Sequence, residues 1–581
     1  MAVFVGSNSD DSRIRSNRVG FAASTSNPAS ASEGDAYYNS GDSKLNVYDG
    51  SSWTALGGSS GSLSGTVSGT ISDGQAVIIK SDGNLAGVTT SVVGVATGSR
   101  STYETGESYF NTVVYDSINK KVVIAYTDGN DSNKPKAVVG TVSGSSIGFG
   151  TATYVYPDYA NVGTAGRRLD GVFDDDTGTV NIVWQYGTSD TGTAYVKTGK
   201  VVGNSIVFDY RTSGGLEISS HGGGTNTAYP TITYDKSAKR IVAGFRHANS
   251  NGYGEAVVLR TNGTGSYRGR SYNNSNDTIP ESYIFNSGST NYPKLCYDDV
   301  NEKVIFGYTN GESTKVGSVR VGTVTPENNS ISFGSTAVFN NNDTYMVNVA
   351  YHSDAERLVV TYQDGNNSFK GTAVVGTVTG TAVTFGTPVV FSTGAAYSME
   401  SRSTIYDPIG KKILVSYRDG GDSNYGKVAV GTVDGDTISF EINRFNDNTS
   451  YNIGIGYDSD SRKTIIACRD VGNSEQGTAR VYNPTFDDTN LTEGNFAGIS
   501  AGAYTNGQTG SVQIEGIVDD AQTGLTTGAK HYVKNDGSIS SKKDFPIVEA
   551  GTAVSATKLL VERNFTDTPG LNIINPPPTF M

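Results

Sequence analysis

Short apolar runs alternate with polar joints along most of this chain, and one motif of that pattern occurs seven times. In its first copy the aromatic-Asp step Tyr115-Asp116 is followed, five residues after the Asp, by the run Lys121 to Tyr126, whose inner positions are all apolar. Repetition at intervals of roughly 50 to 65 residues is the signature of a repeat architecture. The seven steps, which we call anchors, are Tyr115-Asp116, Phe173-Asp174, Tyr234-Asp235, Tyr297-Asp298, Tyr351-His352, Tyr406-Asp407 and Tyr457-Asp458.

Each copy is expected to form four strands. In the first copy these are predicted over 111–116, 121–126, 137–142 and 146–149, because Val, Ile, Thr, Tyr and Phe crowd the runs while Gly, Asn, Asp and Ser crowd the joints. The second strand is apolar at consecutive positions, which favours a sheet buried on both faces between neighbours. The sequence therefore predicts an all-β fold, a seven-bladed β-propeller of four-stranded blades. A linear β-solenoid is the alternative.

The seventh copy predicts how the ring closes. Its third strand is expected over 478–482, and Asn483-Pro484 then breaks the pattern without a clear fourth strand. Upstream of the first anchor, residues 91–95 form an unassigned strand-like run. We therefore expect 91–95 to pair with 478–482, so that ladder hydrogen bonds leave no open edge between the first and last blades.

Composition narrows the function classes. The net charge of −13 argues against nucleic acid or an anionic membrane as a partner. The start of the chain has neither a basic region nor an apolar segment of the kind found in signal peptides, and Cys296 and Cys468 lie inside strand-like runs, where buried thiols are more common than disulfides.

The regions that flank the repeats have their own patterns. Residues 34–40 and 44–53 alternate like two short strands, too small to hold a core alone. Their sequence, GDAYYNS followed by KLNVYDGSSW, resembles a hairpin module in structural proteins of tailed bacteriophages, particularly cyanophages. The phrase GQAVII near residue 75, together with GLTTGAKHYV and GTAVSATKLLV after residue 520, also resembles phage virion proteins, in which such segments form one small β domain.

The resemblance implies a propeller inserted into a loop of that small domain, which suits a closed ring whose two ends meet. The expected domains are 1–60, an arm and virion-attachment hairpin module; 61–90, the first part of the split β domain; 91–490, the propeller; and 491–581, the second part of the split domain with a C-terminal tail.

Candidate chemistry is sparse. Acidic loops follow several second strands, beginning at Asp128, Asp364, Asp419 and Asp470, and could hold Ca²⁺. They lack the acidic residue that closes most calcium loops, so β-turns are the favoured interpretation and no cofactor is expected. No nucleophile motif or singled-out carboxylate pair is found, which predicts that the chain is not an enzyme. His352 replaces Asp in the fifth anchor and is interpreted as a structural variant.

Exposed Tyr and Arg are typical of binding hot spots, and they cluster in a long loop at Tyr267, Arg268, Arg270 and Tyr272, the candidate ligand contacts. An inter-blade loop that only covers its neighbour is the alternative. The resemblance implies a virion-surface tail fibre, spike or vertex fibre, made in the host cytoplasm, that displays a propeller to a host-surface glycan or protein. It would attach to other virion proteins through its N-terminal module and form a homo-oligomer, expected to be a trimer. A glycan-degrading tail spike and a passive capsid decoration protein are the alternatives.

Overall fold

The computed structural model describes most of the chain between residues 62 and 562 and short pieces before it. The described residues are 23–24, 27–28, 36–39, 44–48, 51–56, 62–156, 168–187, 192–208, 215–218, 227–247, 251–261, 267–268, 281–311, 313–492, 494–544 and 546–562. They form two compact units: Val92–Asp487, which we call the larger unit, and Met1–Ser91 with Asp488–Met581, the smaller unit. In the described part of the chain, no helix has the length and apolar character needed to cross a bilayer.

The larger unit is built from antiparallel strands that follow the sequence repeats, so the all-β prediction is confirmed. An inner strand ends at each anchor and pairs with the apolar run behind it. The inner strands are β10 (Ser101–Asp116), β15 (Leu169–Asp174), β20 (Thr227–Asp235), β25 (Thr290–Asp298), β29 (Ala337–His352), β34 (Thr404–Asp407) and β37 (Thr437–Asp458). The second strands are β11 (Lys121–Asp128), β16 (Thr179–Tyr186), β21 (Arg240–His247), β26 (Lys303–Asn310), β30 (Arg357–Asp364), β35 (Lys412–Asp419) and β38 (Lys463–Asp470).

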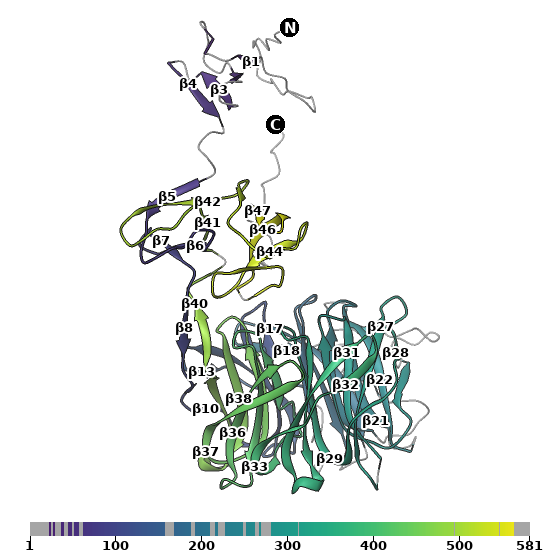
Figure 1. The fold of residues 1–581 in the computed structure, drawn as a ribbon. Coiled ribbons are helices and arrows are strands. Elements are labelled where there is room, and N and C mark those ends of the chain that lie inside the picture. Colours follow the sequence, from purple (N-terminus) through teal and green to yellow (C-terminus); the bar gives the residue numbers. More distant parts are fainter. Residues whose placement is uncertain are drawn as a thin grey trace, which may run out of the picture. The chain divides into compact units, whose positions relative to one another are not determined.

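A third strand pairs with the far side of each second strand. The third strands are β12 (Lys134–Ser143), β17 (Thr193–Val202), β22 (Tyr253–Thr261), β27 (Val316–Thr325), β31 (Lys370–Thr379), β36 (Tyr425–Asp434) and β39 (Gln476–Asn483). The shorter outer strands are β13 (Ser146–Phe149), β14 (Thr153–Tyr154), β18 (Ser205–Phe208), β19 (Leu216–Glu217), β23 (Tyr267–Arg268), β24 (Ser282–Asn286), β28 (Ser330–Phe333), β32 (Ala382–Phe385) and β33 (Val389–Tyr397). These sheets stand side by side in the larger unit (Figure 1), a β-propeller-like arrangement.

Neighbouring repeats share long strands. The first part of β29 pairs with β27 of the fourth repeat, and its second part pairs with β30 of the fifth. β37 links the sixth and seventh repeats in the same way. A chain that passes without interruption from the outer edge of one sheet to the inner edge of the next fixes the spacing of the two sheets.

The ring closes by this same device, and the residues differ from those predicted. The outer strand beside β39 is β9 (Ala96–Thr97) followed by the first part of β10, where Ser101 pairs with Ala479 and Glu107 with Gln476. Residues 91–95 do not pair with 478–482 as expected. Instead β8 (Thr90–Val93) pairs with β40 (Phe486–Thr489). The prediction failed because it paired two short strand-like runs. In the structure, the outer strand of the seventh repeat continues directly into the inner strand of the first repeat.

The anchor Asp residues hold the turn between the first two strands. Oδ1 of Asp116 accepts hydrogen bonds from the backbone N–H groups of Ile118 (3.1 Å) and Asn119 (2.9 Å), and the anchors Asp174, Asp298, Asp407 and Asp458 bind the same two positions of their own turns. Side-chain oxygens that satisfy turn N–H groups are the reason Asp favours such positions.

His352 holds the corresponding turn of the fifth repeat with a ring nitrogen. Its Nδ1 accepts a hydrogen bond from the Ala355 N–H at 3.1 Å, and its Nε2 donates to the Lys411 carbonyl oxygen at 3.1 Å. A ring with one acceptor and one donor nitrogen is neutral. The substitution is thus structural, and the fifth repeat keeps its turn without a carboxylate.

The anchor tyrosines connect one repeat to the one before it. Tyr297 accepts a hydrogen bond from Ser237 in the turn of the third repeat, and the Tyr406 hydroxyl donates to Asp354 in the turn of the fifth. Burial and the nearby Asp458 raise the pKa of Tyr115, so the first anchor faces the seventh across the closure. In the aromatic-Asp step, the Asp therefore makes contacts within its own repeat, and the aromatic residue makes contacts with the preceding repeat.

The core lies between adjacent sheets. One cluster combines Ile305 and Val319 of the fourth repeat with Val349, Leu358 and Val360 of the fifth, all at most 3% exposed. Consecutive positions of a second strand face opposite neighbours, which explains the absence of alternation in these runs.

The smaller unit contains two five-stranded sheets, one of which combines strands from both ends of the chain. β41 (Phe496–Ser500) pairs with β6 (Ala76–Ile79), and β42 (Thr509–Gln513) pairs with β5 (Ser62–Thr66). β7 (Leu85–Gly87) completes the first sheet, and the second contains β43 (Val518–Asp519), β44 (Lys530–Val533), β45 (Ile539–Ser540), β46 (Val548–Ser555) and β47 (Lys558–Val561). Near the N-terminus, β1 (Ala23–Ser24), β2 (Ala36–Asn39), β3 (Lys44–Tyr48) and β4 (Trp53–Leu56) form a four-stranded sheet.

Candidate functional site

The predicted ligand contacts fall almost entirely outside the described side chains. Tyr267 and Arg268 form the short strand β23 beside Arg260 and Thr261 of β22. Arg270 and Tyr272 lie outside the described residues. The loop as a binding site therefore stays a prediction.

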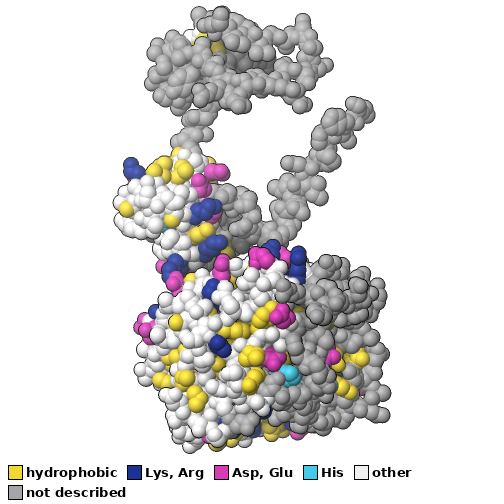
Figure 2. All heavy atoms as spheres, turned by 90° about the vertical axis from the view of Figure 1, so that its right-hand side faces the viewer, with side chains coloured by type: hydrophobic (Ala, Val, Ile, Leu, Met, Phe, Trp, Pro, Cys, Tyr) yellow, Lys and Arg dark blue, Asp and Glu magenta, His cyan; other side chains and the backbone are white. Residues whose placement is uncertain are grey.

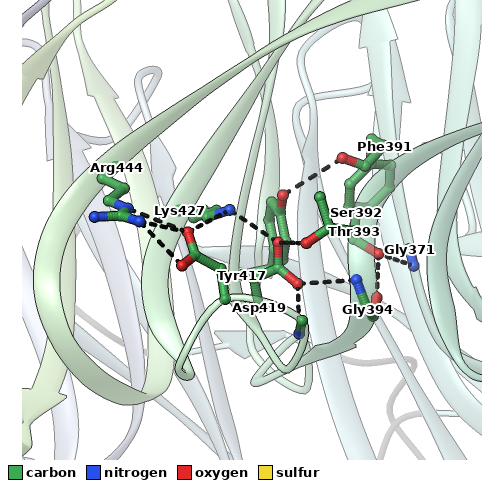
Figure 3. Close-up of polar contacts among 11 residues, drawn as sticks. Gly371, Phe391, Ser392, Thr393, Gly394, Tyr417, Asp419, Lys427 and Arg444 are labelled. Carbon is green, nitrogen blue, oxygen red and sulfur yellow. Dashed lines mark hydrogen bonds and ion pairs between the residues drawn. The ribbon is translucent and has the colours of Figure 1, made fainter.

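The acidic loop of the sixth repeat forms a turn whose carboxylates are occupied by protein donors (Figure 3). Asp419, which is fully buried, accepts hydrogen bonds from the backbone N–H groups of Gly421 (3.0 Å) and Gly394 (3.1 Å) and from the Thr393 hydroxyl (2.8 Å). Lys427 Nζ lies 3.0 Å from Asp419 and 2.9 Å from Asp422. Burial opposes ionisation of Asp419, but these donors outweigh it and lower its pKa.

The first repeat has the same arrangement. Lys136 Nζ lies 2.6 Å from Asp128 and 3.1 Å from Asp131, and the Asn130 N–H donates to Asp128. In these loops a lysine takes the position that a cation would need. Among the residues that the structure describes, no three His, Cys, Asp or Glu side chains gather as ligands, and calcium binding stays an untested alternative.

A strained backbone position recurs on the inner strands. It lies at the end of the sheet opposite to the anchor turn. In five repeats the pairing between inner and second strand slips at the same place, as between Tyr109 and Thr112 in β10. The first unpaired residue of each slip has a positive φ although it is not glycine; these residues are Phe110, Tyr229, Tyr292, Met346 and Asn452. Bulky residues rarely adopt this conformation, and such strain clusters at binding and catalytic sites.

The sixth repeat departs further from the pattern. Its pairing stops at Tyr397 and resumes at Thr404, so the bulge is longer than in the other repeats. This extra backbone carries Met399, Glu400 and Arg402. An enlarged bulge in one repeat of a ring re-aims its side chains toward the centre, where the inner strands converge.

Arg402 links the sixth repeat to the second, third and fourth. Its Nη2 lies 2.9 Å from Oδ2 of Asp170, and the same Nη2 donates to the Ile232 carbonyl oxygen at 2.7 Å. Nη1 donates to the Leu295 carbonyl oxygen at 3.3 Å. Asp170 is fully buried; burial raises its pKa, but Arg402 and the neighbouring cation Lys294 outweigh this and lower it. The centre of the ring is thus pinned by one ion pair.

A pocket opens beside this ion pair, and we call it the axial pocket. The Arg168 guanidinium lies 3.5 Å from the centre of the Tyr229 ring, which contacts Tyr292 edge-on at 5.0 Å. Its enclosed part has room for about one water molecule. Its lining consists of Phe110, Arg168, Leu169, Tyr229, Pro230, Tyr292, Lys294, Met346, Val347, Met399 and Glu400.

Titratable groups in the axial pocket have displaced pKa values. Burial lowers the pKa of Lys294 to about 8, against the opposing effect of Asp170. Burial also raises the pKa of Glu400. Displaced pKa values in a concave, aromatic-lined site are typical of a binding or catalytic centre.

The axial pocket lies at the end of the ring far from where the chain joins it. The inner strands start at this end, since Ser108 pairs with Asp128 at the close of β11. The chain joins and leaves the larger unit near Ala96 and Asn483, which pair at the other end of β39.

Sequence reasoning missed this site, although a signal was present. Four residues before the second residue of the anchor, most repeats have a small or uncharged residue, such as Thr112, Thr231 and Asn348, whereas the second and fourth have Asp170 and Lys294. A charged residue that departs from the repeat pattern at this inward-facing position indicates the pocket.

Comparisons with known proteins give similarity of structure only. No protein-family model and no curated protein matches the chain. Among solved structures, the NanB sialidase from Streptococcus pneumoniae is similar at 12% identity and a TM-score of 0.37, covering 66% of this chain and 69% of its own. The α-L-arabinofuranosidase of Fusarium graminearum is similar at 13% identity and a TM-score of 0.38, covering 66% and 97%. A Dyadobacter fermentans protein of unknown function is similar at 11% identity and a TM-score of 0.39, covering 67% and 99%.

These similar structures correct one prediction. A sialidase and an arabinofuranosidase are enzymes, so the expectation that the chain is not an enzyme is withdrawn. At these TM-scores the likeness assigns no reaction to the chain.

Proposed function

We propose that the chain is a seven-bladed β-propeller inserted into a small β domain, displayed on a tailed-phage virion, and that it binds host-surface glycan through the axial pocket. The observation that supports binding is the axial pocket itself, where strained backbone, two tyrosines and charged groups meet at the centre of the ring. Tyrosine faces and a few charged groups are the means by which proteins hold sugars and other polar ligands.

The virion role is supported by the flanking segments. Their sequences resemble those of phage virion proteins. Residues 1–60 would attach the chain to other virion proteins, and the chain would form a homotrimer. The axial pocket lies at the end of the ring opposite to Ala96 and Asn483, where the chain joins the ring. On the face that Figure 2 shows, Lys and Arg side chains lie interspersed with Asp and Glu, unlike the continuous basic surface that binds nucleic acid.

A test combines adsorption and binding. Purified full chain is expected to bind host cells and to reduce phage adsorption in competition. Tyr229→Ala should abolish this binding, whereas Tyr425→Ala, which alters a tyrosine beside Arg444 at 4.7 Å outside the pocket, should not. Gold labelling should place the chain on the particle surface. Folded wild-type protein that neither binds nor competes would leave passive decoration as the remaining role.

Cleavage of glycan is the second candidate. Glu400 favours it, because a carboxyl whose pKa is raised by burial can act as a general acid near neutral pH. Release of reducing sugar by the wild type, and its loss in Glu400→Gln, would separate cleavage from binding.

A further inference from the structure

Lys294 is a buried cation that, among the described residues, makes no direct polar contact, although the nearby Asp170 favours its charge. Its side chain lies on β25 of the fourth repeat, its residue is 8% exposed, and it lines the axial pocket. Among the described residues it forms neither a hydrogen bond nor an ion pair, since Asp170 is engaged by Arg402, Thr231 and backbone N–H groups.

An ammonium group in this position destabilises the fold. Removing a charge from water opposes folding unless the charge is paired directly with another group. An anion that enters the axial pocket supplies a direct contact for this ammonium, and the low local dielectric strengthens their attraction.

The surroundings define the kind of anion. Arg168 adds a second cation at 3.5 Å from the Tyr229 ring, while Phe110, Met346 and Met399 make the remaining wall apolar. The enclosed space is small, so its deepest part suits a small substituent. A ring can therefore rest against the tyrosines at the mouth while its charged substituent points inward.

We propose that the axial pocket recognises an acidic glycan by its anionic substituent, a carboxylate or a sulfate ester, through the Lys294 ammonium with Arg168 beside it. This inference rests on the proposed glycan-binding function and adds the chemical class of the ligand.

The charges around Lys294 predict how binding depends on pH. The groups that face it are Asp170, Arg402, Arg168 and Glu400. Because the free ammonium loses its proton near pH 8, affinity should fall up to tenfold per pH unit above that value. At low pH, protonation of a carboxylate ligand sets the acid limit, whereas a sulfate ester keeps its charge.

The test uses the full chain on a microarray of acidic and neutral glycans, with carboxyl-reduced and desulfated versions of each acidic glycan. Wild type should bind acidic glycans and lose at least tenfold in affinity when the substituent is removed; the carboxyl-reduced and desulfated arms identify which anion is read. Lys294→Met should lose the same factor and melt at an equal or higher temperature, because it removes an unpaired buried charge. Lys236→Met, a surface change, should match wild type.

The outcomes separate the two proposals. Binding of neutral glycans with equal affinity, full binding by Lys294→Met, or a lower melting temperature for that variant would overturn the anion inference and leave glycan binding intact. Absence of any glycan or host-cell binding by wild type would overturn both.

Discussion

Arg402 pairs with Asp170 at 2.9 Å, although the two residues are 232 positions apart and belong to the sixth and second repeats. Because the pair is central and Asp170 is fully buried, its loss should loosen the whole ring. Arg402→Met should lower the free energy of unfolding by about 3 to 5 kcal/mol in urea denaturation. Arg444→Met, which removes a half-exposed partner of Asp422, should cost under about 1 kcal/mol. Equal effects of the two changes would contradict the central role of the pair.

The neutral ring of His352 makes stability depend on pH. Burial lowers its pKa below the usual value of about 6.5, so the unfolded chain takes up a proton before the folded one does. The contribution of His352 to stability is complete above pH 6.5 and is lost as pH falls below it, by at most about 1.4 kcal/mol per pH unit. His352→Asp restores the residue of the other anchors and should flatten this slope between pH 6.5 and 5. An unchanged slope in that variant would assign the pH dependence to other groups.

How far the sequence predicts this fold depends on which contacts are local. The turn of Asp116 and the pairing of β10 with β11 follow from short-range spacing, and both were predicted. The long-range contacts were not: closure uses 96–107 because strands run on from sheet to sheet, and Arg402 reaches Asp170 only because a bulge turns it inward. Nothing in a single repeat encodes that bulge, and the long loop at Tyr267 attracted attention by composition alone.

Close backbone contact at the closure predicts a sharp effect at Gly98. A Cβ atom there would overlap the carbonyl oxygen of Ser145 in the first repeat. Gly98→Ala should therefore lower the unfolding free energy of the whole ring by about 1 to 3 kcal/mol. Gly94→Ala is the control, because nothing lies within 4 Å of a Cβ atom at that position. Equal melting temperatures for the two variants would show that the closure tolerates the overlap.

The smaller unit should require both ends of the chain. Ala76, Ile78 and Val88 share one core cluster with Phe496 and Val533. Residues 488–562 alone should therefore stay unfolded, whereas residues 62–91 joined to them by a short Gly/Ser linker should fold. Dispersed amide signals in NMR spectra distinguish the two cases; a dispersed spectrum of 488–562 alone would contradict the shared core.

The strand shared by the first and last repeats also has a mechanical meaning. β9 and β39 are neighbours, and the chain continues outward from both at the same end of the ring, next to Ala96 and Asn483. A pull applied through both flanks divides between two adjacent strands and does not peel one from the other. Tension on a ring anchored in this way is carried by the covalent chain on both sides of the seam, and the ladder of hydrogen bonds between them is spared.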